Sequence, residues 1–92
     1  MVTAIVFVQT EVDAIPTTAQ ALADIEGVSE VYSVTGAIDL VVMVRVSSID
    51  DVATVVTEQV NAVAGVRSTE THVAFRAYSR HDLEAAFSLG LS

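Results

Sequence analysis

The fold class of this chain is decided by residues Val28–Val46, which read VSEVYSVTGAIDLVVMVRV. This stretch holds two runs rich in apolar and β-branched residues, Val28–Thr35 and Ile38–Val46, with only Gly36 and Ala37 between them. Runs of this kind favour strands, and a glycine between two of them favours a tight turn. We therefore predict a β-hairpin at the centre of the chain.

A helix is expected on each side of this hairpin. Upstream, Pro16 suits the first turn of a helix, apolar residues then recur every three to four positions, and Gly27 suits the C-terminal end. Downstream, Ser48 is a good N-cap, and Asp51 three residues later suits a capping box. We predict this second helix over Ser48–Val63, because one apolar stripe outweighs the poor helix propensity of its many valines.

The two ends of the chain add one strand each, over Val2–Thr10 and Val66–Ser79. The order β-α-β-β-α-β predicts an α+β, ferredoxin-like fold: a four-stranded antiparallel sheet with both helices on one face, as in dimeric α+β barrels. Residues 1–79 are expected to form this single domain. Residues 80–92 are expected to be a C-terminal extension that can form a short helix over Arg80–Leu89.

Both faces of the predicted sheet are apolar. In the first strand Val6 and Val8 point to one face while Ile5 and Phe7 point to the other, and the strand at 38–46 repeats the pattern. The helices can cover only one face, and monomers rarely leave a large apolar face bare. We therefore expect a second sheet to cover it in a homodimer. The alternative is that the terminal segment, 80–92, folds back over it.

Composition argues against several classes of function. The 92 residues are 52% apolar and 17% charged, with 12 Asp and Glu against 4 basic residues, all Arg, and a net charge of −8. Nucleic-acid affinity comes largely from Lys and Arg that neutralise phosphates, so we expect no direct binding to nucleic acid or to anionic membranes. The chain has no cysteine, no basic leader and no apolar run near the roughly 20 residues that span a bilayer, which indicates a cytoplasmic protein.

Few residues are suited to catalysis. Glu70 and His72 are two apart on the last strand, so they share a face, and such a pair can bind a metal or act as a base. Two ligands are fewer than a catalytic zinc site needs, so a histidine in an interface is the favoured interpretation. The four glycines are dispersed, and no serine has a base and an orienting partner nearby. We predict no catalytic residue, no metal site and no cofactor.

Asp39 is the exception among the carboxylates, because it stands at the start of the most hydrophobic strand. A carboxylate in that position is costly unless it is paired or hydrogen-bonded. It either accepts hydrogen bonds from backbone N–H groups of its own turn or meets the ammonium group of a ligand. The residues alone leave both interpretations open.

Two motifs in this frame resemble the effector domain of the Lrp/AsnC regulators, called RAM for regulation of amino acid metabolism. One is Val34–Leu40, VTGAIDL, which contains the family's TGxxD. The other is Ala64–Thr71, AGVRSTET, where the family has PGV followed by alternating Ser or Thr. The resemblance covers about residues 2–78, and Ala64 in place of the usual Pro is a minor departure.

The resemblance implies an amino-acid-sensing and oligomerisation module that is not an enzyme. Such domains dimerise through their sheets, their dimers form rings that are often octamers, and effector amino acids bind in clefts between dimers. Full-length members also carry an N-terminal winged helix-turn-helix, which these 92 residues do not include. The resemblance therefore implies a stand-alone member, which could modulate transcription by co-assembling with a full-length relative.

The resemblance also implies a ligand site with two walls. The turn supplies the first wall and the start of the last strand supplies the second; together they comprise Thr35, Gly36, Ala37, Ile38, Asp39, Gly65, Val66, Ser68 and Thr69. Backbone N–H groups of a glycine turn suit the carboxylate of an amino acid, Asp39 suits its ammonium, and hydroxyl groups complete a polar shell.

Two other functions stay open at this point. Dimeric α+β barrels also include small cofactor-free oxygenases and isomerases, which need a pocket between sheet and helices. His72, Glu70 and Arg76 would be the candidate residues, since they share one face of the last strand. The remaining alternative is a structural oligomerisation module that binds no ligand.

Overall fold

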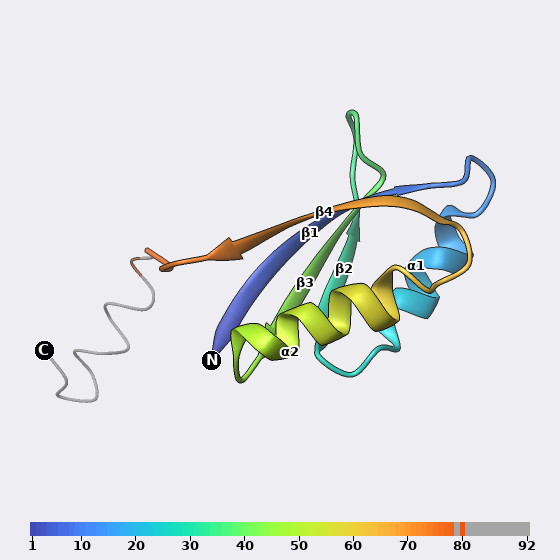
Figure 1. Cartoon of the computed structure of the whole chain (residues 1–92). Coiled ribbons are helices and arrows are strands. Elements are labelled where there is room, and N and C mark those ends of the chain that lie inside the picture. The colour runs from blue at the N-terminus through green and yellow to red at the C-terminus, as the bar shows by residue number, and fades with distance from the viewer. Residues whose placement is uncertain (79, 81–92) are drawn as a thin grey trace, which may run out of the picture.

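The strands form one antiparallel sheet in the computed structural model, which describes residues 1–78 and 80. The elements in chain order are β1 (Val2–Thr10), α1 (Ile15–Ala23), β2 (Val28–Ser33), β3 (Leu40–Val46), α2 (Ile49–Thr54), the π-helix η1 (Val55–Val60) and β4 (Val66–Ala74). The strand order is β2-β3-β1-β4, and every neighbouring pair is antiparallel. Figure 1 shows both helices on the same side of the sheet, so the predicted βαββαβ fold is confirmed.

The hydrophobic core lies between the sheet and the helices. Every second residue of the two central strands is fully buried there, and the helices supply the rest: Ala4, Val6, Val8, Leu40, Val42 and Val44 from the strands, and Leu22, Val52, Val55, Val56 and Val60 from the helices. Burying one valine or leucine side chain stabilises a fold by about 1.5–3 kcal/mol relative to leaving it exposed. This burial explains why a valine-rich segment is helical despite its low propensity.

The start of α2 and the corner that leads into β4 rest on specific contacts, whereas α1 ends at Ala23 and η1 at Val60, each several residues before the glycine expected to end the helix. Ser48 Oγ accepts a hydrogen bond from Asp51 N at 3.2 Å, which confirms the N-cap. Gly65 follows the second helix with φ of +94°, and a Cβ added there would overlap Thr18 Oγ1. Thr18 Oγ1 in turn donates a hydrogen bond to the carbonyl of Ala64 at 3.2 Å. Gly65 is therefore needed both for its backbone conformation and for its small size.

Several boundaries differ from those expected. The central turn is wider than Gly36 and Ala37, because residues 34–39 leave the ladder and Val34 N donates to the carbonyl of Asp39 at 3.1 Å. Strand β4 ends at Ala74, opposite Thr3 near the start of β1, and is therefore shorter than the expected 66–79. The predicted extension over 80–92, with its short helix, lies outside the described residues except for position 80.

The second helix also changes its hydrogen-bonding pattern midway. It is α-helical over α2 and continues as η1, and Asn61 N then donates to Val56 O at 3.0 Å. The wider π spacing still points Val55, Val56 and Val60 into the core. None of the helices in the described part of the chain combines the length and apolar character needed to span a bilayer.

The face of the sheet opposite the helices is apolar at its centre, as predicted. Ile5 and Phe7 of β1 and Val41 and Met43 of β3 are half-buried there, although no element of the described chain lies over them. Tyr32 of β2, opposite Val41, is 51% exposed. We call this surface the open face.

Candidate functional site

A pocket at one end of the open face brings the two predicted walls together. It has a volume of about 240 Å3 and is lined by Phe7, Gln9, Ile38, Ser68, Thr69 and Glu70. Ile38 comes from the turn between β2 and β3, which projects beyond the sheet in Figure 1. The other lining residues come from the end of β1 and the start of β4, which pair with each other.

Gln9 connects the two walls of this pocket. Its Nε2 donates to the carbonyl of Ala37 in the turn at 3.0 Å, and its Oε1 accepts from Ser68 Oγ on β4 at 3.0 Å. These two bonds fix the orientation of the amide, so the turn and β4 are held at a defined spacing. Gln9 was not predicted from the sequence. The only sign of its role in the sequence is that Gln9 is polar, whereas Ile5 and Phe7, the preceding residues on the same face of the strand, are apolar.

Asp39 anchors the turn to the neighbouring strand. Its Oδ2 accepts from the backbone N–H of Thr10 at 2.9 Å, and its own N–H donates to Val8 O at 3.0 Å. The side chain is half-buried, so this bond offsets the cost of removing its charge from water. The partner that the structure gives the carboxylate is therefore in β1, whereas one of the two sequence-based interpretations placed it in the turn itself.

The other residues of the predicted site differ in how they contribute to the pocket. Ile38, Ser68 and Thr69 line it, and Ala37 reaches it through its carbonyl. Thr35 and Gly36 are exposed in the turn. Gly65 accepts from Glu11 N at 2.8 Å, and Val66 packs against the core. The structure thus brings Ala37 and Ile38 of the first motif together with Ser68 and Thr69 of the second at the pocket. The earlier residues of both motifs lie outside it.

Glu70 and His72 meet on the open face beside the pocket. His72 Nε2 lies 2.7 Å from Glu70 Oε2, and the imidazole ring lies 5.1 Å from the ring of Phe7. Both side chains are more than half exposed. They point away from the helices, whereas the enzyme alternative needs them between the sheet and the helices. Arg76 lies beyond the end of β4.

The family follows from comparison with known proteins. The sequence model of one protein family, the Lrp/AsnC ligand binding domain, matches residues 3–83, which is most of the chain. The chain belongs to this family. Its fold, its TGxxD turn and its Gly65-Val66 corner are the features that the resemblance in sequence relied on. No curated protein matches the chain.

Solved structures include relatives of this Lrp/AsnC domain that have about its own length. It is 41% identical to TTHA0845 from Thermus thermophilus, with a TM-score of 0.82, over 87% of this chain and 100% of that one. It is 27% identical to the hypothetical protein PHS023 from Pyrococcus horikoshii, with a TM-score of 0.77, over 88% and 98%. The fold also matches that of the transcriptional regulator NMB0573 from Neisseria meningitidis, solved as an L-Met complex, with 15% identity and a TM-score of 0.77, over 86% of this chain and 53% of that one.

A polar network of the Lrp/AsnC domain lies on the β2 side of the open face. Arg45 Nη1 lies 2.8 Å from Glu30 Oε1, and the Tyr32 hydroxyl donates to Glu30 Oε2 at 2.9 Å. The hydrogen bond from Arg45, and then that from Tyr32, lowers the pKa of Glu30 below its ordinary value. The same bond to Glu30 raises the pKa of Tyr32. The network therefore places paired charges at the rim of the apolar centre.

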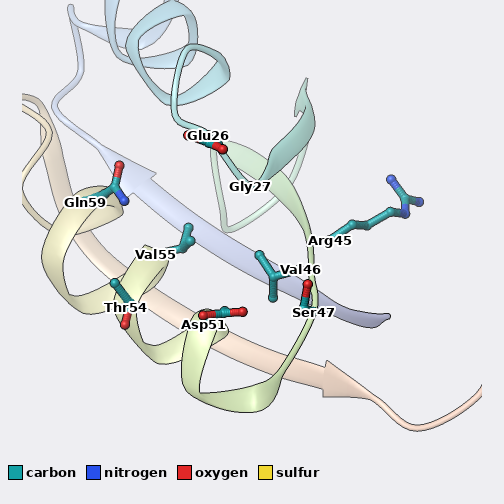
Figure 2. Close-up of a pocket in the computed structure, with 9 residues that line it drawn as sticks. All are labelled: Glu26, Gly27, Arg45, Val46, Ser47, Asp51, Thr54, Val55 and Gln59. Atoms are coloured by element: carbon teal, nitrogen blue, oxygen red, sulfur yellow. The ribbon is translucent and has the colours of Figure 1, made fainter.

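A second hollow of the Lrp/AsnC domain lies on the helix side, at the junction of α2, η1 and the turn that follows α1 (Figure 2). It has a volume of about 480 Å3, and its carboxylates are Glu26 and Asp51. Figure 2 shows Arg45 extending away from the other lining residues, consistent with its bond to Glu30. In the described part of the chain no group of three or more acidic or histidine side chains could hold a metal ion.

Proposed function

We propose that this Lrp/AsnC domain senses a small effector, an amino acid, in the pocket between Ile38 and Ser68, as part of a homo-oligomer. The observation that carries the proposal is the pair of hydrogen bonds in which Gln9 donates to Ala37 O and accepts from Ser68 Oγ. These bonds bring together the two motifs that carry the resemblance to the Lrp/AsnC effector domain, which are about thirty residues apart in the chain.

The chemistry of the pocket favours an amino acid. Its volume of about 240 Å3 lies below the roughly 300–1,000 Å3 typical of pockets for drug-sized ligands, so a small metabolite fits it better. Phe7 and Ile38 offer an apolar surface for a side chain, and Ser68 offers a hydroxyl, whereas the Thr69 hydroxyl donates to Asn61 Oδ1 on the helix side. The backbone N–H groups around Gly36 suit a carboxylate, and Asp39 and Glu70 are the nearby carboxylates that suit an ammonium group. The L-Met complex of NMB0573 supports this class of ligand.

A second copy of the chain is the partner that suits the open face. The apolar centre formed by Ile5, Phe7, Val41 and Met43 is surrounded by polar side chains, which is the usual anatomy of a protein interface. A sheet packed on this centre would also close the neighbouring pocket on one side. Ligand binding and assembly would then stabilise each other. Larger rings, a full-length Lrp/AsnC partner, a role in transcription and a cytoplasmic location belong to the same proposal.

The enzyme alternative has less support. Its candidates His72 and Glu70 are on the open face, and Arg76 lines a different hollow with Phe75 and Tyr78. A structural module without a ligand is the second candidate, because the open face alone explains association. Ligand binding separates the two.

Thermal unfolding in the presence of each proteinogenic amino acid at millimolar concentration tests the proposal. An effector at about 100 times its dissociation constant stabilises the native state by about 2.7 kcal/mol. For a small domain this corresponds to a rise in Tm of about 10 °C or more. Gln9→Ala should reduce the shift, whereas Gln20→Ala, at an exposed glutamine on α1, should not. If no amino acid raises the Tm of the unmodified chain, the sensing function is wrong and the structural module is favoured.

A further inference from the structure

Glu70 is the carboxylate best placed to meet a positively charged group in the pocket. It lines the pocket directly, together with Gln9 and Ser68, which are neutral. Asp39 is not among the lining residues, and its Oδ2 already accepts the hydrogen bond from Thr10 N. An ammonium group entering the pocket would therefore reach the carboxylate of Glu70 before that of Asp39.

His72 is the group that already contacts this carboxylate. Its Nε2 lies 2.7 Å from Glu70 Oε2 on the same strand, two residues along. The paired strand β1 presents Ile5 and Phe7 opposite this pair and has no charged residue from Val2 to Thr10. On β4 itself, Arg67 lies at the irregularity in the pairing with β1, and its Nε is 3.9 Å from Glu11 Oε1.

We propose that Glu70 binds the ammonium group of the effector, and that protonated His72 competes with that ammonium for the carboxylate. This inference rests on the proposed function, since it assigns the recognition of the amino group at the same pocket. A neutral imidazole places no positive charge beside Glu70, so the effector's ammonium has no competing cation at the carboxylate. A protonated imidazole pairs with it, so the effector must displace an existing ion pair to bind.

The direction of the pH dependence follows from this competition. Histidine side chains change charge within about pH 5–8, whereas the ammonium of a free amino acid stays charged throughout that range. Effector affinity should therefore rise as the pH increases from about 5.5 to about 7.5. A site whose carboxylate had no such competitor would show little change over the same interval.

Calorimetric titration of the full chain tests the role of Glu70. The probes are the amino acid that gives the largest thermal shift and its deamino analogue, the same carboxylic acid without the amino group. Glu70→Gln should weaken binding of the amino acid by about 10- to 100-fold, the loss expected for one charge-assisted hydrogen bond, and should leave binding of the analogue unchanged. Glu58→Gln, on the exposed side of η1, is the matched control.

Three results distinguish the possible failures. If the amino acid binds but Glu70→Gln has no effect while Asp39→Asn removes binding, the assignment of Glu70 is wrong and the sensing function stands. If no amino acid binds, both are wrong. The variant His72→Asn should abolish the rise in affinity between about pH 5.5 and 7.5 while keeping the affinity measured at the higher pH. An unchanged pH profile in His72→Asn would overturn the competition.

Discussion

At the scale of single residues, two side chains hold the turn between β2 and β3 in place, and they do so differently. Gln9 reaches the turn from the open face through Ala37 O, and Asp39 reaches back from the turn to the backbone of Thr10. Asp39 is half-buried, and its hydrogen bond explains how a carboxylate is tolerated there, whereas Gln9 is exposed and its bonds serve to position the turn.

Substitution of Asp39 should reveal its structural role. Thr10 is only 4% exposed, so Asp39→Ala leaves its N–H without the carboxylate acceptor and should lower the free energy of unfolding by about 1–3 kcal/mol. Asp39→Asn keeps an oxygen acceptor and should cost clearly less. Urea denaturation of the two variants measures the difference. Equal losses would show that the charge of Asp39, rather than its hydrogen bond to Thr10, is what matters.

The ion pair of Arg45 with Glu30 should appear as a pH-dependent contribution to stability. The pKa of Glu30 is lowered from its ordinary 4.5 in the folded chain. A lowered pKa means that the contribution is present above pH 4.5 and is lost as the pH falls through the lower, folded-state value. The Tm difference between the unmodified chain and Glu30→Gln should therefore shrink in acid. Because the group is exposed, the effect should be small, and a difference that grows in acid would contradict it.

At the scale of elements, the composition and the period of the apolar residues determined what could be predicted. Runs rich in apolar and β-branched residues identified β1 and β3, and the helical stripe identified the segment that contains Val52 and Val56 as a helix. The ends were less predictable, because they depend on partners far along the chain. Strand β4 stops opposite Thr3, near the start of β1, and no local feature near Ala74 signals this. The switch from α2 to η1 had no signal in the sequence pattern either.

The candidate site was predictable to the extent that it depends on motifs. Ile38, Ser68 and Thr69 were expected and do line the pocket. Gln9 was not expected, because its role comes from the pairing of β1 with β4 and from the position of a turn about thirty residues away. No sequence feature near a glutamine on a strand predicts such a contact.

The corner between η1 and β4 should tolerate no side chain larger than hydrogen at Gly65. Its φ is +94°, which costs a residue with a Cβ about 1–3 kcal/mol, and the added Cβ would also overlap Thr18 Oγ1. Gly36 has a similar φ of +111°, but a Cβ there meets nothing within 4 Å. Gly65→Ala should therefore destabilise the chain more than Gly36→Ala in thermal or urea unfolding. The opposite order would mean that the packing of α1 against this corner is wrong.

At the scale of the whole molecule, the sheet is covered on one face and open on the other. The same alternation that fills the core with Val6 and Val42 places Phe7 and Val41 on the open face. A second sheet would bury that face without any change in the fold. The candidate pocket, at the edge of the open face, would then be completed by assembly.

A charge at the centre of the open face should therefore block association. Met43→Asp places a carboxylate among Ile5, Phe7 and Val41, and its burial in an interface would be costly. Size-exclusion chromatography with light scattering should show a smaller particle for this variant than for the unmodified chain. Val12→Asp, at a site that is 89% exposed in the turn after β1, is the control and should leave the mass unchanged. A Met43→Asp variant with the original mass would show that another surface mediates association.

The most direct measurement is a crystal structure of the chain grown with the amino acid that raises its Tm most. The proposed function requires that molecule in the pocket between the turn and β4, in contact with Gln9 or Ser68 from one side and Ile38 from the other. Its presence there would establish the effector and the site together. Binding only in the hollow of Glu26 and Asp51 (Figure 2), or no bound amino acid at all, would contradict the central claim.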